Sequence, residues 1–296
     1  MLFPGQGTQT PRMGDPWRGS PAWEVVERAE AALGQPLAPL LLDASEDDLR
    51  RTRDAQLVVL LASLMAWEAV RDQVATPVAF AGHSLGQVTA LIASGALSLE
   101  DGVRFAAARA DATQAAADAD PGRMAALIGA SAESAEEACA GLDAWLANDN
   151  APGQVVIGGT PAGVEAAAAR AKDLGIRRVI PLNVGAAFHT RLMGPAAEAL
   201  APVLAATPFS VPAAPIVSNA DARPYADGDG WPERLAAHLV SPVRWRSSME
   251  TLAGLDVDTF FEVGPGNVLA ALARRTVPAI GVRGISVPTD ALLEVA

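Results

Sequence analysis

The segment VAFAGHSLG at residues 78–86 predicts a buried strand, a sharp turn and the start of a helix in direct succession. Its first four residues form a short apolar run, which suits a strand that is covered on both faces. Apolar residues then recur at helical spacing over 85–94, and Gly95 ends the helix. A second buried strand is expected at 259–263, again directly before a glycine-rich turn. Strand, glycine turn and helix in this order are typical of a parallel α/β sheet.

The middle of the chain follows another order, strand-helix-strand-strand-helix-strand. Ser131 and Thr160 are expected to cap its two helices. The expected strands are 124–128, one around 145–147, 154–157 and 178–182, and the expected helices are 131–142 and 160–175. This order is the ferredoxin-like pattern. We therefore expect an α/β fold in which a large α/β-hydrolase-like domain with a parallel sheet, residues 1–121 and 189–296, carries an inserted ferredoxin-like subdomain at 122–188.

Composition and charge argue against several classes of protein. Half of the 296 residues are apolar, which is enough for a sizeable core and too much for a disordered chain. With 22 basic and 34 acidic residues the net charge is −12, so we expect binding neither to nucleic acid nor to an anionic membrane surface. The most apolar window, 57–67, is shorter than the roughly 18 residues of a membrane span.

The expected compartment is the cytoplasm. Cys139 is the only cysteine, so no internal disulfide can form, and unpaired cysteine is usual in the reducing cytosol. The first residues, 1–5, show neither the basic start nor the apolar stretch of a signal peptide.

The chemistry is expected at Ser84, the central residue of a G-x-S-x-G turn. A strand-to-helix turn of this kind exposes the serine hydroxyl, and the N-terminus of the next helix offers N–H groups to a developing anion. The alternative is a glycine-rich turn with a capping serine, and the flanking strand and helix favour the nucleophile. A serine nucleophile needs a base, and the candidates are His83, His189 and His238. His83 is adjacent in sequence and is expected to be structural, whereas His189 lies at the junction of the two predicted domains, where clefts form.

Two more residues are candidates for substrate contact. Gln6 lies between two glycines directly after the first strand, so its backbone N–H could approach a substrate oxygen, although an ordinary loop has the same sequence. Arg109 lies among alanines on a helix expected at 102–117. Its guanidinium either extends into solvent or pairs with an acidic side chain. The alternative is that it faces the cleft and binds a carboxylate in a bidentate manner. No His/Cys/Asp cluster has metal-ligand spacing, so no metal is expected.

In this order the motifs resemble the malonyl-CoA:acyl carrier protein transacylases and the related acyltransferase domains of polyketide synthases. The resemblance runs along nearly the whole chain. It rests on FPGQG at 3–7, GHSLG at 82–86, Arg109 with Gln114, NAPGQVV at 150–156, FHT at 188–190, SN at 218–219, SPVRW at 241–245 and EVGPG at 262–266.

The resemblance implies a serine–histidine dyad. Ser84 would attack the thioester, and His189 would take its proton and later that of the incoming pantetheine thiol. The backbone N–H groups of Gln6 and Leu85 would form the oxyanion hole. Arg109 would hold the free carboxylate of the malonyl group.

Phe188 bears on the choice of acyl group, and three features depart from the family pattern. Phe188, directly before the base, matches the bulky residue of malonyl-selecting relatives, and its other interpretation is core packing at the domain junction. His238 stands where the family often has a glutamine whose backbone carbonyl orients the catalytic histidine, a contact that survives the difference. Gln87 stands where the family usually has an acid. The first strand, 1–3, is shorter than usual, which is compatible with a natural start upstream.

The function implied is transfer of malonyl from malonyl-CoA to the phosphopantetheine thiol of an acyl carrier protein, by a ping-pong mechanism through a malonyl-serine. Malonyl-CoA is then a substrate, no cofactor is expected to be bound, the carrier protein is the partner and a monomer is the expected state. Fatty-acid and polyketide synthesis both stay open. The alternative is an editing hydrolase or esterase of the same fold, which Arg109 disfavours because it fits a carboxylated acyl group. A non-catalytic docking protein is disfavoured by the presence of Ser84, His189 and Arg109.

Overall fold

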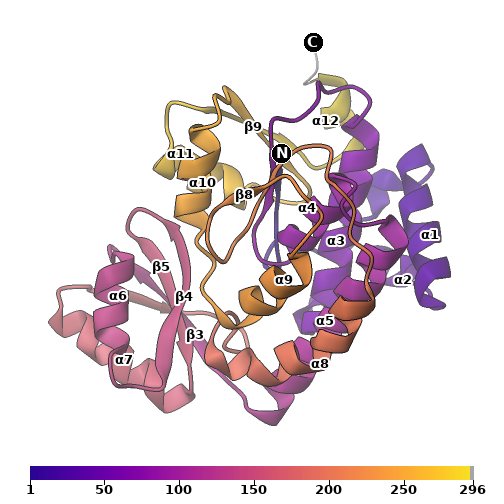
Figure 1. Cartoon of the computed structure of the whole chain (residues 1–296). Helices are drawn as coiled ribbons and strands as arrows, with labels where there is room; N and C mark the ends of the chain where they lie inside the picture. Colours follow the sequence, from indigo (N-terminus) through magenta and orange to yellow (C-terminus); the bar gives the residue numbers. More distant parts are fainter. Residues whose placement is uncertain (294–296) are drawn as a thin grey trace.

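The computed structural model describes residues 1–293 of the chain. Within that range two sheets organise the protein, and they lie in separate parts of the molecule (Figure 1). The large sheet has six strands in the order β10-β9-β1-β2-β7-β8, and the small sheet has four in the order β4-β5-β3-β6. Both ends of the chain therefore contribute to the large sheet, and the middle of the chain forms the small one.

The large sheet is mixed. Its strands are β1 (Leu2–Phe3), β2 (Phe80–Gly82), β7 (Ile216–Val217), β8 (Pro224–Tyr225), β9 (Thr259–Val263) and β10 (Gly281–Ile285). Strands β10, β9, β1, β2 and β7 run parallel, whereas β8 pairs antiparallel with β7. The predicted parallel sheet is thus correct for five strands and wrong for β8, because the short connection 218–223 returns the chain as a hairpin.

Ten helices of residues 1–293 surround the large sheet. They are α1 (Glu24–Leu33), α2 (Ala38–Leu42), α3 (Thr52–Val70), α4 (Gly86–Ala93), α5 (Leu99–Ala119), α8 (Gly194–Ala206), α9 (Trp231–Val240), α10 (Trp245–Ala253), α11 (Val268–Thr276) and α12 (Pro288–Leu293). The apolar window 57–67 lies inside α3 and is buried throughout, as its sequence predicts. In the part of the chain that the structure describes, no helix is long and apolar enough to cross a membrane.

The small sheet is antiparallel throughout. Its elements are β3 (Arg123–Ile128), α6 (Ala132–Cys139), β4 (Ala144–Ala151), β5 (Gln154–Gly159), α7 (Pro161–Asp173) and β6 (Arg178–Pro181). The predicted caps are confirmed, since the Ser131 side chain accepts the Ser134 N–H and the Thr160 side chain accepts the Gly163 N–H. The sheet and its two helices enclose an apolar core of their own.

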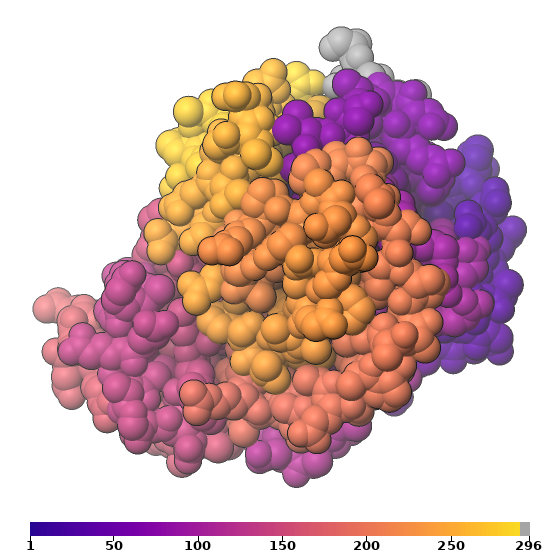
Figure 2. All heavy atoms as spheres, viewed as in Figure 1, coloured from indigo at the N-terminus to yellow at the C-terminus, as the bar shows by residue number. Residues whose placement is uncertain are grey.

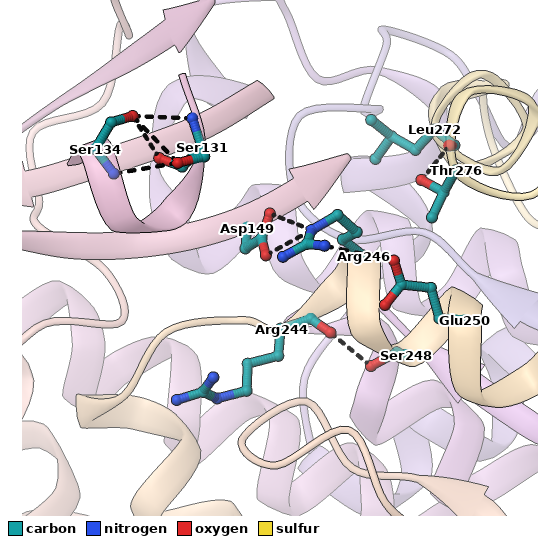
Figure 3. Close-up of polar contacts among 9 residues, drawn as sticks. All are labelled: Ser131, Ser134, Asp149, Arg244, Arg246, Ser248, Glu250, Leu272 and Thr276. Carbon is teal, nitrogen blue, oxygen red and sulfur yellow. Dashed lines mark hydrogen bonds and ion pairs between the residues drawn. The ribbon is translucent and has the colours of Figure 1, made fainter. Parts of the chain in front are cut away.

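The two parts are joined along β4. The Asp149 N–H donates to the Val243 carbonyl, and the Val243 N–H donates to the Ala147 carbonyl. Beside this bridge the Asp149 carboxylate accepts a hydrogen bond from Arg246 of α10 at 3.0 Å (Figure 3). In the space-filling view the small part is a lobe at the lower left (Figure 2). Backbone pairing and an ion pair therefore tie this lobe to the rest of the molecule.

Some element boundaries differ from those predicted. Strand β2 begins two residues later than expected, and Val78 is 51% exposed. Strand β4 spans eight residues instead of about three. Strands β7 and β8 have two residues each, which is too short for any periodicity to be detected.

Candidate active site

Ser84 occupies the tight turn between β2 and α4 with a left-handed backbone. Its φ is +54°, which is uncommon for a residue other than glycine. Two glycines let this turn pack directly against the loop after β1. A Cβ on Gly86 would overlap the Phe3 carbonyl, and a Cβ on Gly5 would overlap the His83 carbonyl. The loop that carries Gln6 is thereby held beside the serine.

Asn219 holds the serine turn in this conformation. Its Oδ1 accepts the Ser84 N–H at 2.8 Å, and its Nδ2 donates to the Gly82 carbonyl at 2.7 Å. The Asn219 N–H donates to Oε1 of the buried Gln87 at 2.9 Å. A strained backbone persists only where its surroundings fix it, and these three hydrogen bonds supply that support.

His189 lies against Ser84 and also has a left-handed backbone, with φ +60°. Its Nε2 is 2.7 Å from Ser84 Oγ, and its Nδ1 is 2.9 Å from the His238 carbonyl oxygen. A carbonyl only accepts, so Nδ1 carries the proton, and in a neutral imidazole Nε2 is then the acceptor. The Ser84 hydroxyl therefore donates to His189, which is the arrangement that removal of the serine proton requires.

The surroundings of His189 keep it neutral. The residue is only 4% exposed. Burial, and after it the positive charge of Arg109, lower the pKa of His189 to about 3. The imidazole thus stays unprotonated at neutral pH, with Nε2 able to accept a proton.

Arg109 reaches the same serine from α5. It is buried, its Nη1 donates to Gln56 Oε1 of α3, and its Nη2 donates to Ser84 Oγ at 3.3 Å. Burial lowers the pKa of Arg109 to about 10, which leaves the guanidinium cationic at neutral pH. Within residues 1–293 no carboxylate forms an ion pair with it. The Arg109 side chain therefore points to Ser84 and reaches neither solvent nor an acid among the described residues.

A cavity of about 680 Å³ lies between the two parts of the molecule. Its walls include five predicted site residues besides Ser84, namely Gln6, Leu85, Arg109, Phe188 and His189. The volume suits a small-molecule site. Phe188 is half-buried and also packs against two apolar clusters, so it both lines the cavity and contributes to the junction. His238 does not line the cavity and lies behind His189, with the two ring centroids 4.7 Å apart.

His83 also lines the cavity, and its ring contacts residues other than Ser84. Its Nε2 is 2.8 Å from Asn150 Oδ1, and its ring meets Trp245 edge-on at 5.3 Å. These contacts agree with the structural role expected for it.

The sequence does not predict the roles of two residues of the site, Gln56 and Asn219. Gln56 contacts Arg109, and the sequence offers only the signal of a polar residue directly before the apolar run 57–67. Asn219 belongs to a motif of the resemblance, but its contact with Ser84 joins positions 135 residues apart. Among residues 1–293 no group of three His, Cys, Asp or Glu side chains could hold a metal ion.

Comparison with known proteins places this site in context. A family model described as "Acyl transferase domain" matches residues 1–289. The malonyl CoA-acyl carrier protein transacylase of Bacillus subtilis (strain 168) is 38% identical over 281 residues, which cover 93% of this chain and 89% of that protein. The protein of the same name from Escherichia coli (strain K12) is 37% identical over 297 residues, covering 97% and 96%.

Solved structures are also similar to this chain over nearly its whole length. The acyl-carrier-protein S-malonyltransferase of Burkholderia pseudomallei 1710b has a TM-score of 0.93 at 34% identity and covers 99% of this chain and 98% of its own. A malonyl-transacylase solved in complex with its type II polyketide synthase acyl-carrier protein has a TM-score of 0.94 at 31% identity, covering 100% and 98%. Sequence and structure thus agree along nearly the full length of the chain.

Proposed function

The chain belongs to the acyl transferase family of the malonyl-CoA:acyl carrier protein transacylases, and from this we propose that it moves a malonyl group from malonyl-CoA to the phosphopantetheine thiol of an acyl carrier protein. One observation of the site carries the proposal. The Arg109 guanidinium, buried and cationic, lies 3.3 Å from the hydroxyl of Ser84. A group that can bind a carboxylate thus lies next to the nucleophile. A malonyltransferase needs such a group, whereas an unselective esterase does not.

In the first half-reaction Ser84 Oγ attacks the thioester carbonyl while His189 Nε2 takes the hydroxyl proton. The tetrahedral oxyanion then collapses, the C–S bond breaks, and the coenzyme A thiolate leaves with the proton from His189. The N–H groups of Gln6 and Leu85 would stabilise the oxyanion. In support of this role, both residues line the cavity, and neither N–H donates a hydrogen bond within the described part of the chain.

In the second half-reaction the pantetheine thiol gives its proton to His189 and attacks the malonyl-serine ester. The C–O bond to Ser84 breaks, and His189 returns the proton to the serine oxygen. One base thus serves both steps. The kinetics are ping-pong because coenzyme A leaves before the carrier thiol attacks the malonyl-serine. The neutral tautomer of His189, fixed by the His238 carbonyl, supports this assignment.

Arg109 would select the acyl group in both steps. In a malonyl-serine three single bonds of about 1.5 Å separate Oγ from the carboxylate carbon. The guanidinium at 3.3 Å from Oγ is therefore within reach of the carboxylate oxygens. With Nη1 held by Gln56, the arginine enters the site from a fixed direction.

We extend the proposal to the domains and the cell. Residues 1–121 and 189–296 would form an α/β-hydrolase-like domain, and 122–188 a ferredoxin-like one. The turn of Ser84 between β2 and α4 supports the first, and the strand order β4-β5-β3-β6 supports the second. A cytoplasmic monomer without a bound cofactor stays a prediction.

Intact-mass measurement after incubation with malonyl-CoA tests the mechanism. We expect one malonyl adduct on the wild-type chain and none on Ser84→Ala, with the fold retained. His189→Ala should slow both half-reactions. Adding an acyl carrier protein should discharge the adduct to malonyl-carrier. Release of free malonate instead would favour the editing hydrolase, and a malonyl adduct on Ser84→Ala would exclude Ser84 as the nucleophile.

A further inference from the structure

The ring of His238 stacks on the ring of His189. The two centroids are 4.7 Å apart and the planes differ by 25°. Each residue is 4% exposed, so the pair is shielded from solvent. The backbone carbonyl of His238 already holds Nδ1 of His189. The side chain of the same residue therefore makes a second, separate contact with the proposed base.

The His238 ring has an unfavourable feature that packing alone does not explain. Its Nε2 is buried and has no hydrogen-bond partner among residues 1–293. A buried polar atom without a partner destabilises the folded state. An apolar side chain of similar size would fill the position without that penalty.

The groups that face the pair are neutral or positive. Arg109 of α5 and His83 of the serine turn act on both rings electrostatically. Among the described residues no carboxylate hydrogen-bonds to either ring. Burial, and then the neighbouring His189, hold the pKa of His238 well below its ordinary value. At neutral pH both rings are uncharged, so their contact is a stack of two neutral rings.

We infer that the side chain of His238 is a positioning residue for the base, because its ring fixes the plane of the His189 imidazole and keeps Nε2 directed at Ser84. The torsion that rotates an imidazole is broad, and the two hydrogen bonds at Nδ1 and Nε2 leave the ring plane free to tilt about the line through these atoms. A second ring against its face removes this freedom. The inference rests on the proposed role of His189 as the general base.

The test compares His238→Phe, which keeps a ring, with His238→Leu and His238→Gln, which do not. All three keep the backbone carbonyl. The measurement is the single-turnover rate of malonyl-serine formation from malonyl-CoA between pH 5 and 9, with thermal unfolding as the folding control. We expect His238→Phe to stay within about twofold of the wild type. The ringless variants should be about three- to tenfold slower, the range that an aromatic pair contributes.

Two further readouts separate positioning from general damage. The KM for malonyl-CoA should not change, since His238 does not line the cavity. An acid limb should enter the measured range from below pH 5 in His238→Leu and His238→Gln, because water then reaches His189 and its pKa rises. In His238→Phe, as in the wild type, the limb should stay below that range.

The inference is overturned if the ringless variants acylate at the wild-type rate, or if His238→Phe is as slow as they are. Should the phenyl ring prevent folding, His238→Leu and His238→Gln still decide, because both must slow acylation to a similar extent despite their different polarity. A wild-type chain that forms no malonyl-serine would instead refute the proposed function itself.

Discussion

Arg109→Ala should convert a malonyl-selective enzyme into one that barely distinguishes malonyl from acetyl. The guanidinium donates to Gln56 and, at 3.3 Å, to Ser84 Oγ. A malonyl carboxylate replaces the second contact with a charge-assisted hydrogen bond, worth about 1.5–3 kcal/mol. At 1.36 kcal/mol per factor of ten, kcat/KM for malonyl-CoA should fall about 10- to 150-fold.

Acetyl-CoA should respond differently. The acetyl group offers no anion to the guanidinium, so the removal of the Arg109 side chain should leave acetyl loading unchanged. The assay is the initial rate of acyl-serine formation from malonyl-CoA and acetyl-CoA in competition, read by intact mass. Arg109→Lys is the matched control, because it keeps the charge but loses the planar fork and should show an intermediate preference. Equal losses for both acyl groups would refute carboxylate recognition and would assign Arg109 to the orientation of Ser84.

Three other changes follow from contacts at the site. Phe188→Ser opens the cavity wall next to His189 and should reduce the preference for malonyl over methylmalonyl. The reduction should reach at most the contribution of one methyl group, about 1–3 kcal/mol, in a competition between the two thioesters. An unchanged ratio would mean that Phe188 is only a packing residue. Asn219→Ala leaves the Ser84 N–H and the Gly82 carbonyl without partners. The free energy of unfolding should therefore fall by about 2–6 kcal/mol in urea titrations, and acylation should slow. A loss below about 1 kcal/mol would contradict the role of Asn219 in holding the serine turn. Between pH 6.5 and about 3, His189 binds a proton in the unfolded chain but not in the folded one, where it is buried. The free energy of unfolding should therefore decrease as the pH falls through this window, by up to about 1.4 kcal/mol per pH unit for this group. A urea midpoint that is flat from pH 6.5 to 4.5 would show that His189 is not buried as a neutral ring.

The sequence predicts those parts of the fold in which the signal is local. The G-x-S-x-G turn, the caps at Ser131 and Thr160 and the buried helix 57–67 each depend on residues a few positions apart, and each is found as expected. The sequence does not predict the antiparallel β8, because a two-residue strand carries no periodic pattern. Its pairing is decided by the length of a hairpin connection.

In the site, the reacting groups are easier to predict from the sequence than the residues that support them. Ser84, His189 and Arg109 stand in recognisable motifs, and the structure brings His189 and Arg109 within hydrogen-bond distance of Ser84. Gln56 and Asn219 act through contacts that span 53 and 135 residues of sequence, and no local pattern encodes such a contact. The stacking of His238 on His189 is of the same kind, since only the fold shows that the two rings meet.

The attachment of β4 to the large part of the molecule sets the boundaries for building chimeras with relatives. A graft of residues 122–188 alone would carry Asp149 away from Arg246 and would lay a foreign strand edge along Val243. Arg246 would then lose its ion pair with Asp149. Any change in the orientation of the lobe would also move His189, which directly follows the graft. The exchangeable module is therefore discontinuous in sequence: it consists of 122–188 together with the 243–246 segment, and recombination libraries should keep the two inserts from one parent.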